Sequence, residues 1–324
     1  MTRPERFPDF FLVGAPRCGT TALSRYLADH PQVCFSRPKE PHYFALLAPD
    51  ASLDDLETAY LSRHFAHHHA GHRAIGEGSV SYLYSPHAVE RILGVNPDAR
   101  FIAILRNPLE MLPSYHLRML FVLCEDVADF AAAWRLQDMR ARGQHVPRHC
   151  VDARLLLYRE VARYGVQIER LYRVAGRERC HVVLFDELAR DPASVYRQVL
   201  QFVGVDDDGR TSFKRRFPSR IYRYRWLQVL LYAARSRRAH AVDTLQRGAR
   251  ARPWPGRCQS LVKRLARWNR SERRPAPLDD AMRATLRAAF TDDVALLARL
   301  LGRDLQHWLG DVTGATPRDG RNTP

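Results

Sequence analysis

Short apolar runs alternate with amphipathic stretches through the first two thirds of the chain. Three runs, FFLVGA at 10–15, RFIAIL at 100–105 and CHVVLF at 180–185, are rich in β-branched or aromatic residues and predict buried strands. A shorter strand is expected from residue 74. Helical periodicity predicts helices at 20–30, 53–65, 86–94, 109–121, 127–141, 154–175, from Asp191-Pro192 onward, and at 278–301. Strands that alternate with helices predict an α/β fold with a central parallel sheet flanked by helices.

The same pattern predicts one domain over residues 1–324. Its core is expected at about 9–203. Residues 206–276 are rich in arginine, lack clean strands and are expected to form a variable cover of helices and loops. A C-terminal helix is expected within 278–309, with Trp308 packing the end of the chain, and residues 311–324 are expected to be frayed.

The main feature of the composition is its excess of positive charge. The 324 residues carry a net charge of +16, and only three of the 51 Lys and Arg residues are lysines. Arginine codon preference or a surface that handles phosphate-like anions would each produce this bias. The six cysteines are scattered without a C-x-x-C pair, and the histidines at 64–72 lack acidic or cysteine partners, so no metal is expected. Since no apolar run of about 18 residues and no leader-like N-terminus is present, we expect a cytoplasmic protein without a membrane span.

The first candidate site follows the first strand. Gly14-Ala15-Pro16-Arg17-Cys18-Gly19-Thr20-Thr21 is close to the G-x-x-x-x-G-K-[ST] loop that cradles phosphate at a helix N-terminus. It predicts a three-layer, P-loop-like fold. Thr20 stands where the lysine of nucleotide hydrolases would be, so hydrolysis of ATP or GTP is poorly supported.

Three further patterns lie at strand ends or in turns. Arg106-Asn107-Pro108 follows the strand at 100–105, and Ser114 lies eight residues after Arg106, so a guanidinium and a hydroxyl could converge on one phosphate. Lys39-Glu40-Pro41-His42-Tyr43-Phe44 places an acid and an imidazole two residues apart. Gly76-Glu77-Gly78-Ser79 places a carboxylate at a probable strand end. Each pattern alone is also compatible with an ordinary turn or surface.

Together these motifs resemble the sulfotransferases that use 3′-phosphoadenosine 5′-phosphosulfate (PAPS), in particular bacterial members related to the heparan-type carbohydrate enzymes. The resemblance covers residues 9–203 and 278–309. It implies that PAPS is the co-substrate, that no metal is required, and that a sulfuryl group passes to a hydroxyl or amine of a glycan, glycolipid or secondary metabolite. It assigns the 5′-phosphosulfate to Arg17, Cys18, Gly19, Thr20, Thr21 and Ala22, and the 3′-phosphate to Arg106 and Ser114.

The resemblance also implies catalytic roles. Glu40 would take the proton of the acceptor, with His42 beside it. Arg17 would stabilise the leaving group electrostatically, because arginine donates a proton poorly. Glu77 would orient the acceptor or Arg17. Related enzymes often carry a lysine after the acid that matches Glu77, but here it is Gly78, so one cation is absent or supplied elsewhere.

Two other functions remain open from the sequence. One is a divergent P-loop nucleotide kinase, which magnesium-ATP dependence would support. The other is a non-catalytic basic module for nucleic acid or acidic polymer, suggested by the arginines between Tyr222, Tyr224 and Trp226. These aromatics could equally belong to the core or to an acceptor rim, and we expect no nucleic-acid partner. The acceptor's identity and the oligomeric state are not encoded in any pattern that we can interpret.

Overall fold

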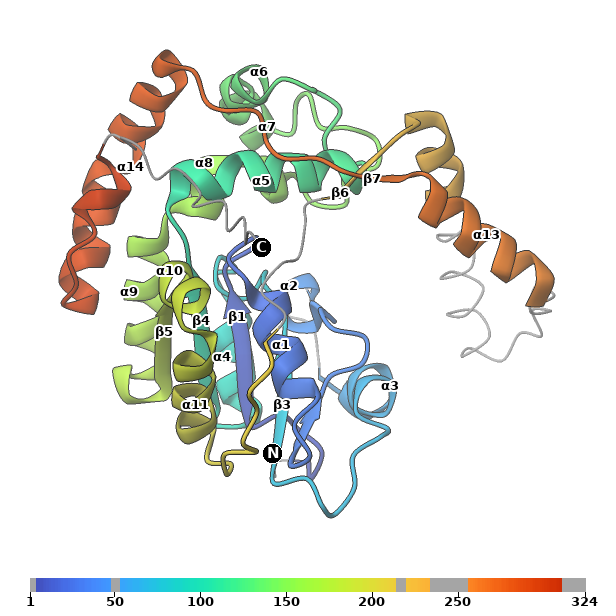
Figure 1. Cartoon of the computed structure of the whole chain (residues 1–324), viewed down its shortest axis with the longest axis vertical. Coiled ribbons are helices and arrows are strands. Elements are labelled where there is room, and N and C mark those ends of the chain that lie inside the picture. Colours follow the sequence, from blue (N-terminus) through green and yellow to red (C-terminus); the bar gives the residue numbers. More distant parts are fainter. Residues whose placement is uncertain (1–3, 48–52, 214–219, 234–255, 311–324) are drawn as a thin grey trace, which may run out of the picture.

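Five parallel strands form the centre of the protein, in the spatial order β2-β3-β1-β4-β5 (Figure 1). The strands span Phe10–Gly14 (β1), Val33–Phe35 (β2), Ala74–Gly78 (β3), Arg100–Leu105 (β4) and Cys180–Leu184 (β5). The computed structural model describes residues 4–47, 53–213, 220–233 and 256–310. The predicted parallel sheet flanked by helices is confirmed.

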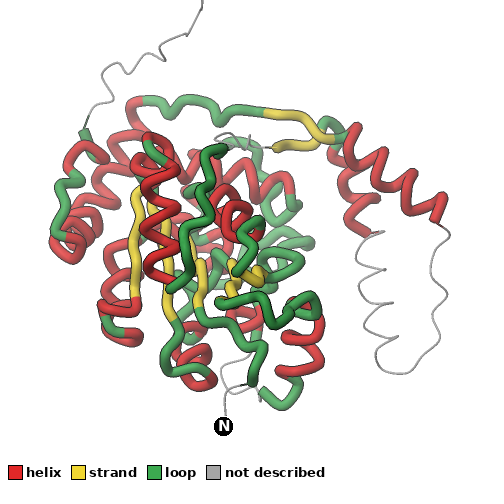
Figure 2. Tube along the Cα trace, turned by 60° about the horizontal axis from the view of Figure 1, so that its bottom comes forward, coloured by secondary structure: helices red, strands yellow, loops and turns green. Residues whose placement is uncertain are grey.

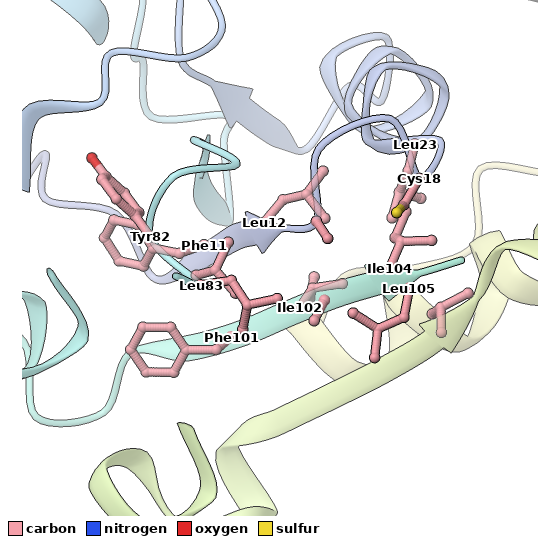
Figure 3. Close-up of a cluster of buried hydrophobic side chains, with 14 of the residues drawn as sticks. Phe11, Leu12, Cys18, Leu23, Tyr82, Leu83, Phe101, Ile102, Ile104 and Leu105 are labelled. Carbon is pink, nitrogen blue, oxygen red and sulfur yellow. The ribbon is translucent and has the colours of Figure 1, made fainter. Parts of the chain in front are cut away.

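The sheet is the core of the molecule because both of its faces are covered. All five residues of β1 are buried, and in β4 only Arg100 is exposed. Figure 3 shows Phe11 and Leu12 of β1 beside Phe101 and Ile102 of β4, and Leu23 of the first helix above Ile104. Strands buried on both faces read as continuous apolar runs, which is why the sequence identified β1, β4 and β5.

Helices form a layer on each side of the sheet (Figure 1). The helix α1, Thr20–Ala28, lies on the same side as α11, Pro192–Val203, and the rings of Tyr26 and Tyr196 meet edge to face at 6.2 Å. The opposite side carries α4, Ala88–Val95, and α9, Tyr164–Ala175, and α14, Asp280–Leu301, packs outside α9. The long helix α5, Pro108–Phe121, crosses beyond the carboxyl ends of the strands.

Several further helices and turns complete the fold. They are α2 (Tyr43–Leu46), a π-helical turn at Leu56–Leu61, α3 (Ser62–His64), α6 (Phe130–Arg135), α7 (Gln137–Ala141), α8 (Tyr158–Ala162), α10 (Phe185–Arg190) and α13 (Gly256–Trp268), with 3-10 turns at Ala153–Leu156, Arg177–Arg179 and Gln306–Trp308. Asp191 caps α11 as predicted, because its carboxylate accepts a hydrogen bond of 3.0 Å from the Ser194 amide. Trp308 is buried, which confirms its predicted packing role.

Two predicted helices are broken in the structure. The helix expected at 127–141 is split at Leu136 into α6 and α7. The one expected at 154–175 is divided at Leu157 and Arg163, both of which leave the helical conformation. Asp293 of α14 caps the new start of α9 by accepting hydrogen bonds from the Gly165 and Val166 amides, at 2.9 and 3.1 Å. Because the capping residue lies 128 positions away, the sequence around Gly165 does not predict where α9 begins.

The expectation that residues 206–276 lack strands is wrong. Arg220–Tyr222 (β6) and Arg270–Glu272 (β7) pair antiparallel beside the end of α5. Figure 2 shows this ribbon leading into two helices, a helix over residues 225–233 and α13, which project from the body. Residues 214–219 and 234–255 of the expected cover, and the tail predicted to be frayed, residues 311–324, lie outside the described residues.

Candidate active site

The loop between β1 and α1 points its backbone toward the carboxyl edge of the sheet. Arg17 and Gly19 both have left-handed backbone conformations, with φ of 62° and 93°. A side chain at Gly19 would meet Leu188 Cδ2 at 3.0 Å in addition to the unfavourable φ, so glycine is required there. Because α1 begins at Thr20, its first amide groups are available to an anion at this loop.

Three arginines gather around this loop. The Arg17 Nε donates a hydrogen bond of 2.9 Å to the Ser114 Oγ of α5, which joins the first and second predicted motifs. Burial lowers the pKa of Arg17, and the positive charges of Arg118 and Arg106 lower it further. Arginines that repel one another across a partly buried site are stabilised by a bound anion, so the cluster of Arg17, Arg106 and Arg118 favours a polyanionic ligand.

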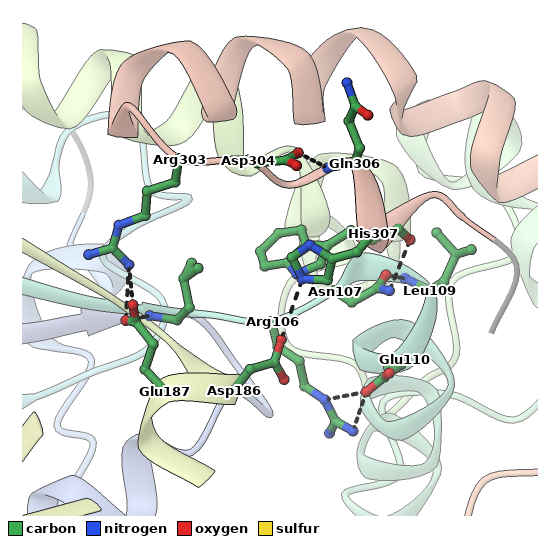
Figure 4. A network of polar contacts seen from close by, with 12 residues as sticks. Arg106, Asn107, Leu109, Glu110, Asp186, Glu187, Arg303, Asp304, Gln306 and His307 are labelled. Carbon is green, nitrogen blue, oxygen red and sulfur yellow. Dashed lines mark hydrogen bonds and ion pairs between the residues drawn. The ribbon is translucent and has the colours of Figure 1, made fainter. Parts of the chain in front are cut away.

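Arg106 is held at the start of α5 by contacts on two sides. Its Nε and Nη2 donate to Glu110 at 3.1 and 2.8 Å, and its guanidinium lies 4.6 Å from the centre of the Phe185 ring. The adjacent Asn107 donates to the Trp308 carbonyl at 2.9 Å (Figure 4). The C-terminal segment therefore holds residues 106–108 in place, and we call these residues the Arg106 corner. The same network includes an ion pair between Arg303 and Glu187 at 2.8 Å.

Glu40 and His42 come from a second segment, the one that joins β2 to α2. Both have positive φ, 66° and 56°. The Lys39 Nζ donates to one oxygen of Glu40 at 2.5 Å, and the His42 Nε2 lies 3.8 Å from the other. Burial alone would raise the pKa of Glu40, but the Lys39 ammonium outweighs it and the net pKa is lowered. Burial also lowers the pKa of His42, whose Nδ1 is 2.7 Å from the Ser81 Oγ. The site therefore presents an ionised carboxylate beside a neutral imidazole at neutral pH.

Glu77 lies beneath this surface. Its side chain is fully buried in β3, and one carboxylate oxygen accepts hydrogen bonds from Tyr60 at 2.8 Å and Tyr82 at 2.7 Å. Burial raises the pKa of Glu77 to about 7. With no exposed atom and no place in the wall of the cavity, Glu77 can act on an acceptor only through the residues that cover it.

These groups surround a cavity of about 890 Å³, which we call the central cavity. A volume of this size suits a nucleotide with room for a second substrate. Its wall includes Pro16, Arg17, Gly19, Thr20, Thr21, Ala22, Arg25, Tyr26, Glu40, His42, Val80, Tyr84, Arg106, Ser114, Tyr115, Arg118, Met119, Val122, Cys124, Leu155, Phe185, Leu188, Ala189 and Glu272.

The structure brings nearly all of the predicted site residues together. Nine line the central cavity: Arg17, Gly19, Thr20, Thr21, Ala22, Glu40, His42, Arg106 and Ser114. The side chain of Cys18 does not. It is buried beneath the loop, where its Sγ lies 3.6 Å from the Tyr164 hydroxyl, and burial raises the pKa of the thiol to about 12. A contribution of Cys18 to a ligand would therefore come from its backbone.

Sequence reasoning missed two cations at this site. Arg118 lines the central cavity, one helical turn after Ser114 on α5, and that spacing is a signal that the sequence contained. Lys39 lies beside the base candidate. A Cβ built on Gly78 would lie 3.0 Å from the Phe35 ring and 3.4 Å from the Lys39 Cε, so this lysine lies next to Gly78. That arrangement depends on the fold and has no local signal.

Over the described ranges, no group of three or more His, Cys, Asp or Glu residues is arranged to hold a metal ion. The helices of the described part of the chain include none with the length and apolar content needed to cross a bilayer.

Several known proteins are similar to this chain. The sulfotransferase family matches residues 8–53 and 36–209. A sulfotransferase from Alicyclobacillus acidocaldarius has a similar structure, with a TM-score of 0.62, 28% identity, and coverage of 93% of this chain and 98% of that one. The membrane-associated sulfotransferase kil1 of Dictyostelium discoideum is 30% identical over 112 residues, which cover 34% of this chain and 22% of that protein. Human carbohydrate sulfotransferase 15 is 30% identical over 152 residues, covering 34% of this chain and 27% of that protein.

The chain matches only about a quarter of the length of each of these two curated relatives. The family match includes the loop at Arg17, Glu40 and the Arg106 corner. More than half of the chain is therefore covered by one family, and its fold agrees with that of a solved member over nearly the whole length. The chain belongs to the sulfotransferase family.

Proposed function

We propose that the protein transfers a sulfuryl group from PAPS to a hydroxyl or amine of a glycan or a related small molecule. One observation carries the proposal: Arg17, Arg106 and Arg118 converge with the N-terminus of α1 on a cavity whose wall also holds Glu40. PAPS carries phosphate at two positions of one nucleoside and supplies the sulfuryl group. The separated cations of the central cavity fit a ligand with several anionic groups.

The loop would bind the 5′-phosphosulfate. The backbone amides at Gly19–Thr21 and the hydroxyls of the two threonines supply hydrogen-bond donors, and Arg17 supplies charge. Arg106 and Ser114 would bind the 3′-phosphate, with the guanidinium already oriented by Glu110 and Phe185. Because Arg17 donates to Ser114, the same hydrogen bond links the two phosphate sites and fixes their separation.

Glu40 would act as the general base. Its carboxylate is ionised at neutral pH, because Lys39 lowers its pKa, and it lines the same cavity as the arginines. As the acceptor oxygen or nitrogen forms a bond to sulfur, its proton passes to Glu40, and the bond from sulfur to the phosphate oxygen breaks. The negative charge that develops on that phosphate is stabilised by Arg17, which keeps its own proton. The imidazole of His42, held by Ser81, would hydrogen-bond to the acceptor.

Thermal unfolding in the presence of nucleotides tests the donor site. We expect 3′-phosphoadenosine 5′-phosphate, the product of the reaction, to stabilise the protein by about 2.7 kcal/mol at 100 times its dissociation constant. Arg106→Ala should abolish this shift, whereas Arg197→Ala, an exposed arginine on α11, should retain it. A larger shift with magnesium-ATP, or an unchanged shift in Arg106→Ala, would contradict the proposed donor.

Turnover then tests the base. Glu40→Gln keeps the size of the side chain and removes its ability to accept a proton. It should bind 3′-phosphoadenosine 5′-phosphate normally and lose at least about a hundredfold in kcat. Full turnover in this variant would remove Glu40 from the mechanism.

A further inference from the structure

A helical arm projects from the body beside the central cavity. It consists of the described residues 220–233 and 256–274, which contain β6, the helix over 225–233, α13 and β7 (Figures 1 and 2). We call this segment the basic arm. Its two helices pack through Leu227, Leu231 and Ala266, a small core separate from that of the body. At its base, Gln228 donates to the Phe121 carbonyl of α5 at 2.9 Å.

The positive charge of the whole chain is concentrated in this region of the sequence. Residues 214–278 contain 19 Lys and Arg against two Asp and Glu, whereas the rest of the chain contains 32 against 33. Arginine codon preference alone would spread the excess along the chain. Within the described arm the exposed cations are Arg223, Arg225, Lys263, Arg264, Arg267, Arg273 and Arg274. The basic arm is therefore a localised cationic surface on an otherwise neutral protein.

The basic arm also exposes apolar side chains. Five of the eight large hydrophobic residues that are exposed in the described parts of the chain belong to it: Tyr224, Trp226, Leu230, Leu265 and Trp268. Trp226 is 63% and Trp268 is 52% exposed, and the Tyr224 ring stacks on Trp268 with centroids 5.5 Å apart. Exposed apolar groups at this density mark an interaction surface.

We infer that the basic arm docks onto the surface of an anionic phospholipid bilayer. Clustered Lys and Arg are attracted to anionic headgroups, and Trp and Tyr are favoured at the boundary between headgroups and acyl chains. A polyanion such as RNA or an acidic glycan would satisfy the arginines, but it would leave Leu230 and Leu265 exposed to water. A bilayer interface accommodates both kinds of side chain, as it does for basic amphipathic helices that lie on membranes.

The position of the basic arm connects this surface to the proposed reaction. Glu272 of β7 lines the central cavity, together with Val122 and Cys124 just beyond α5. Docking of the arm would place the cavity mouth close to the lipid surface. This consequence rests on the proposed function, but binding to lipid does not, so the two can fail separately.

Co-sedimentation of the full chain with vesicles tests the inference. Vesicles of equal parts phosphatidylglycerol and phosphatidylcholine should bind the protein, and vesicles of phosphatidylcholine alone should bind it at least about tenfold more weakly. The double variant Arg264→Ala/Arg267→Ala should lower partitioning by about 30-fold, and Trp226→Ser/Trp268→Ser by at least about tenfold. All four side chains are exposed, so the fold is expected to be retained, and thermal unfolding checks this.

Matched controls separate the membrane from other partners. Arg190→Ala/Arg197→Ala removes two exposed arginines from the body, and Val151→Ser/Val166→Ser removes two exposed apolar side chains. Both should partition like the wild type. The inference is overturned if the vesicles that contain phosphatidylglycerol fail to bind the protein, or if the controls lose as much binding as the arm variants. It is equally overturned if the tryptophan variant binds vesicles unchanged while heparin or RNA binding depends on the same arginines, since that pattern identifies a polyanion site.

Discussion

Replacing Glu77 with glutamine should make the protein more stable at alkaline pH. The carboxyl group is fully buried in β3, and burial raises its pKa from 4.5 to about 7. The folded state therefore holds the proton more tightly than the unfolded chain does. As pH rises from 4.5 through 7, the carboxyl group ionises in the unfolded chain but stays protonated in the folded protein, so the free energy of unfolding falls. A glutamine at this position has no proton to lose and escapes that fall.

The size of the effect follows from the two pKa values. A rise from 4.5 to about 7 corresponds to about 3.4 kcal/mol of stability that is lost once the pH exceeds both values. Roughly 0.8 kcal/mol of this is already lost at pH 5, because part of the unfolded population is ionised there. The difference in unfolding free energy between Glu77→Gln and the wild type should therefore increase by about 2.5 kcal/mol from pH 5 to pH 8.5.

Urea denaturation at the two pH values measures this difference. Glu90→Gln, an exposed position on α4, is the matched control and should leave the pH dependence of the wild type unchanged. Glu77→Gln should also retain binding of 3′-phosphoadenosine 5′-phosphate, because Glu77 contributes no atom to the central cavity. A stability difference that is equal at both pH values would refute the assignment of Glu77 as a carboxyl group whose ionisation opposes folding.

Three other predictions concern the site. Lys39→Ala should raise the pKa of Glu40, because the ammonium 2.5 Å away lowers it in the wild type. The acid limb of the pH profile of kcat/KM should then move to higher pH, and an unchanged limb would show that Lys39 does not lower the pKa of the base. Ser114→Ala removes the hydrogen bond from Arg17 and should raise the KM for PAPS by about tenfold in steady-state assays; an unchanged KM would exclude that bond from donor binding. Since burial raises the pKa of Cys18 to about 12, its thiol should resist alkylation at pH 8 in the folded protein and react in urea; mass spectrometry that finds it modified in the folded state would contradict this.

The parts of the fold that the sequence predicted are those with local causes. The strand predicted at 100–105 coincides with β4, because a β-branched apolar run ended by Asn107-Pro108 needs no tertiary information. The strand β2 was missed because three residues are too few to show a pattern. The broken helix before α9 was missed because its cap comes from Asp293 in another helix.

The same distinction between local and tertiary causes applies to the candidate site. The loop at Arg17 and the Arg106 corner could be predicted, since each depends on a few adjacent residues at the end of a strand. Their connection, the hydrogen bond from Arg17 to Ser114, could not, because it crosses 97 residues of sequence. The burial of Glu77 could not be predicted either. This carboxylate lies in a strand whose five residues are all buried, so it can act on an acceptor only through the residues that cover it.

Gly78 shows most clearly why the site has to be judged in three dimensions. Position by position, the sequence suggested that a cation next to Glu77 was absent or supplied elsewhere. A Cβ at Gly78 would lie 3.0 Å from the Phe35 ring and 3.4 Å from the Lys39 Cε, so the space that a side chain from this strand would enter is already occupied, most closely by Phe35 and then by Lys39. The ammonium that bonds to Glu40 thus arrives from the neighbouring segment, and it is also among the charges that act on Glu77. A lysine introduced at 78 would crowd Phe35 and repel Lys39, and would therefore not restore a missing function. Gly78 and Lys39 therefore have to be considered together. The position of the positive charge determines its effect on the site, whichever segment carries the lysine.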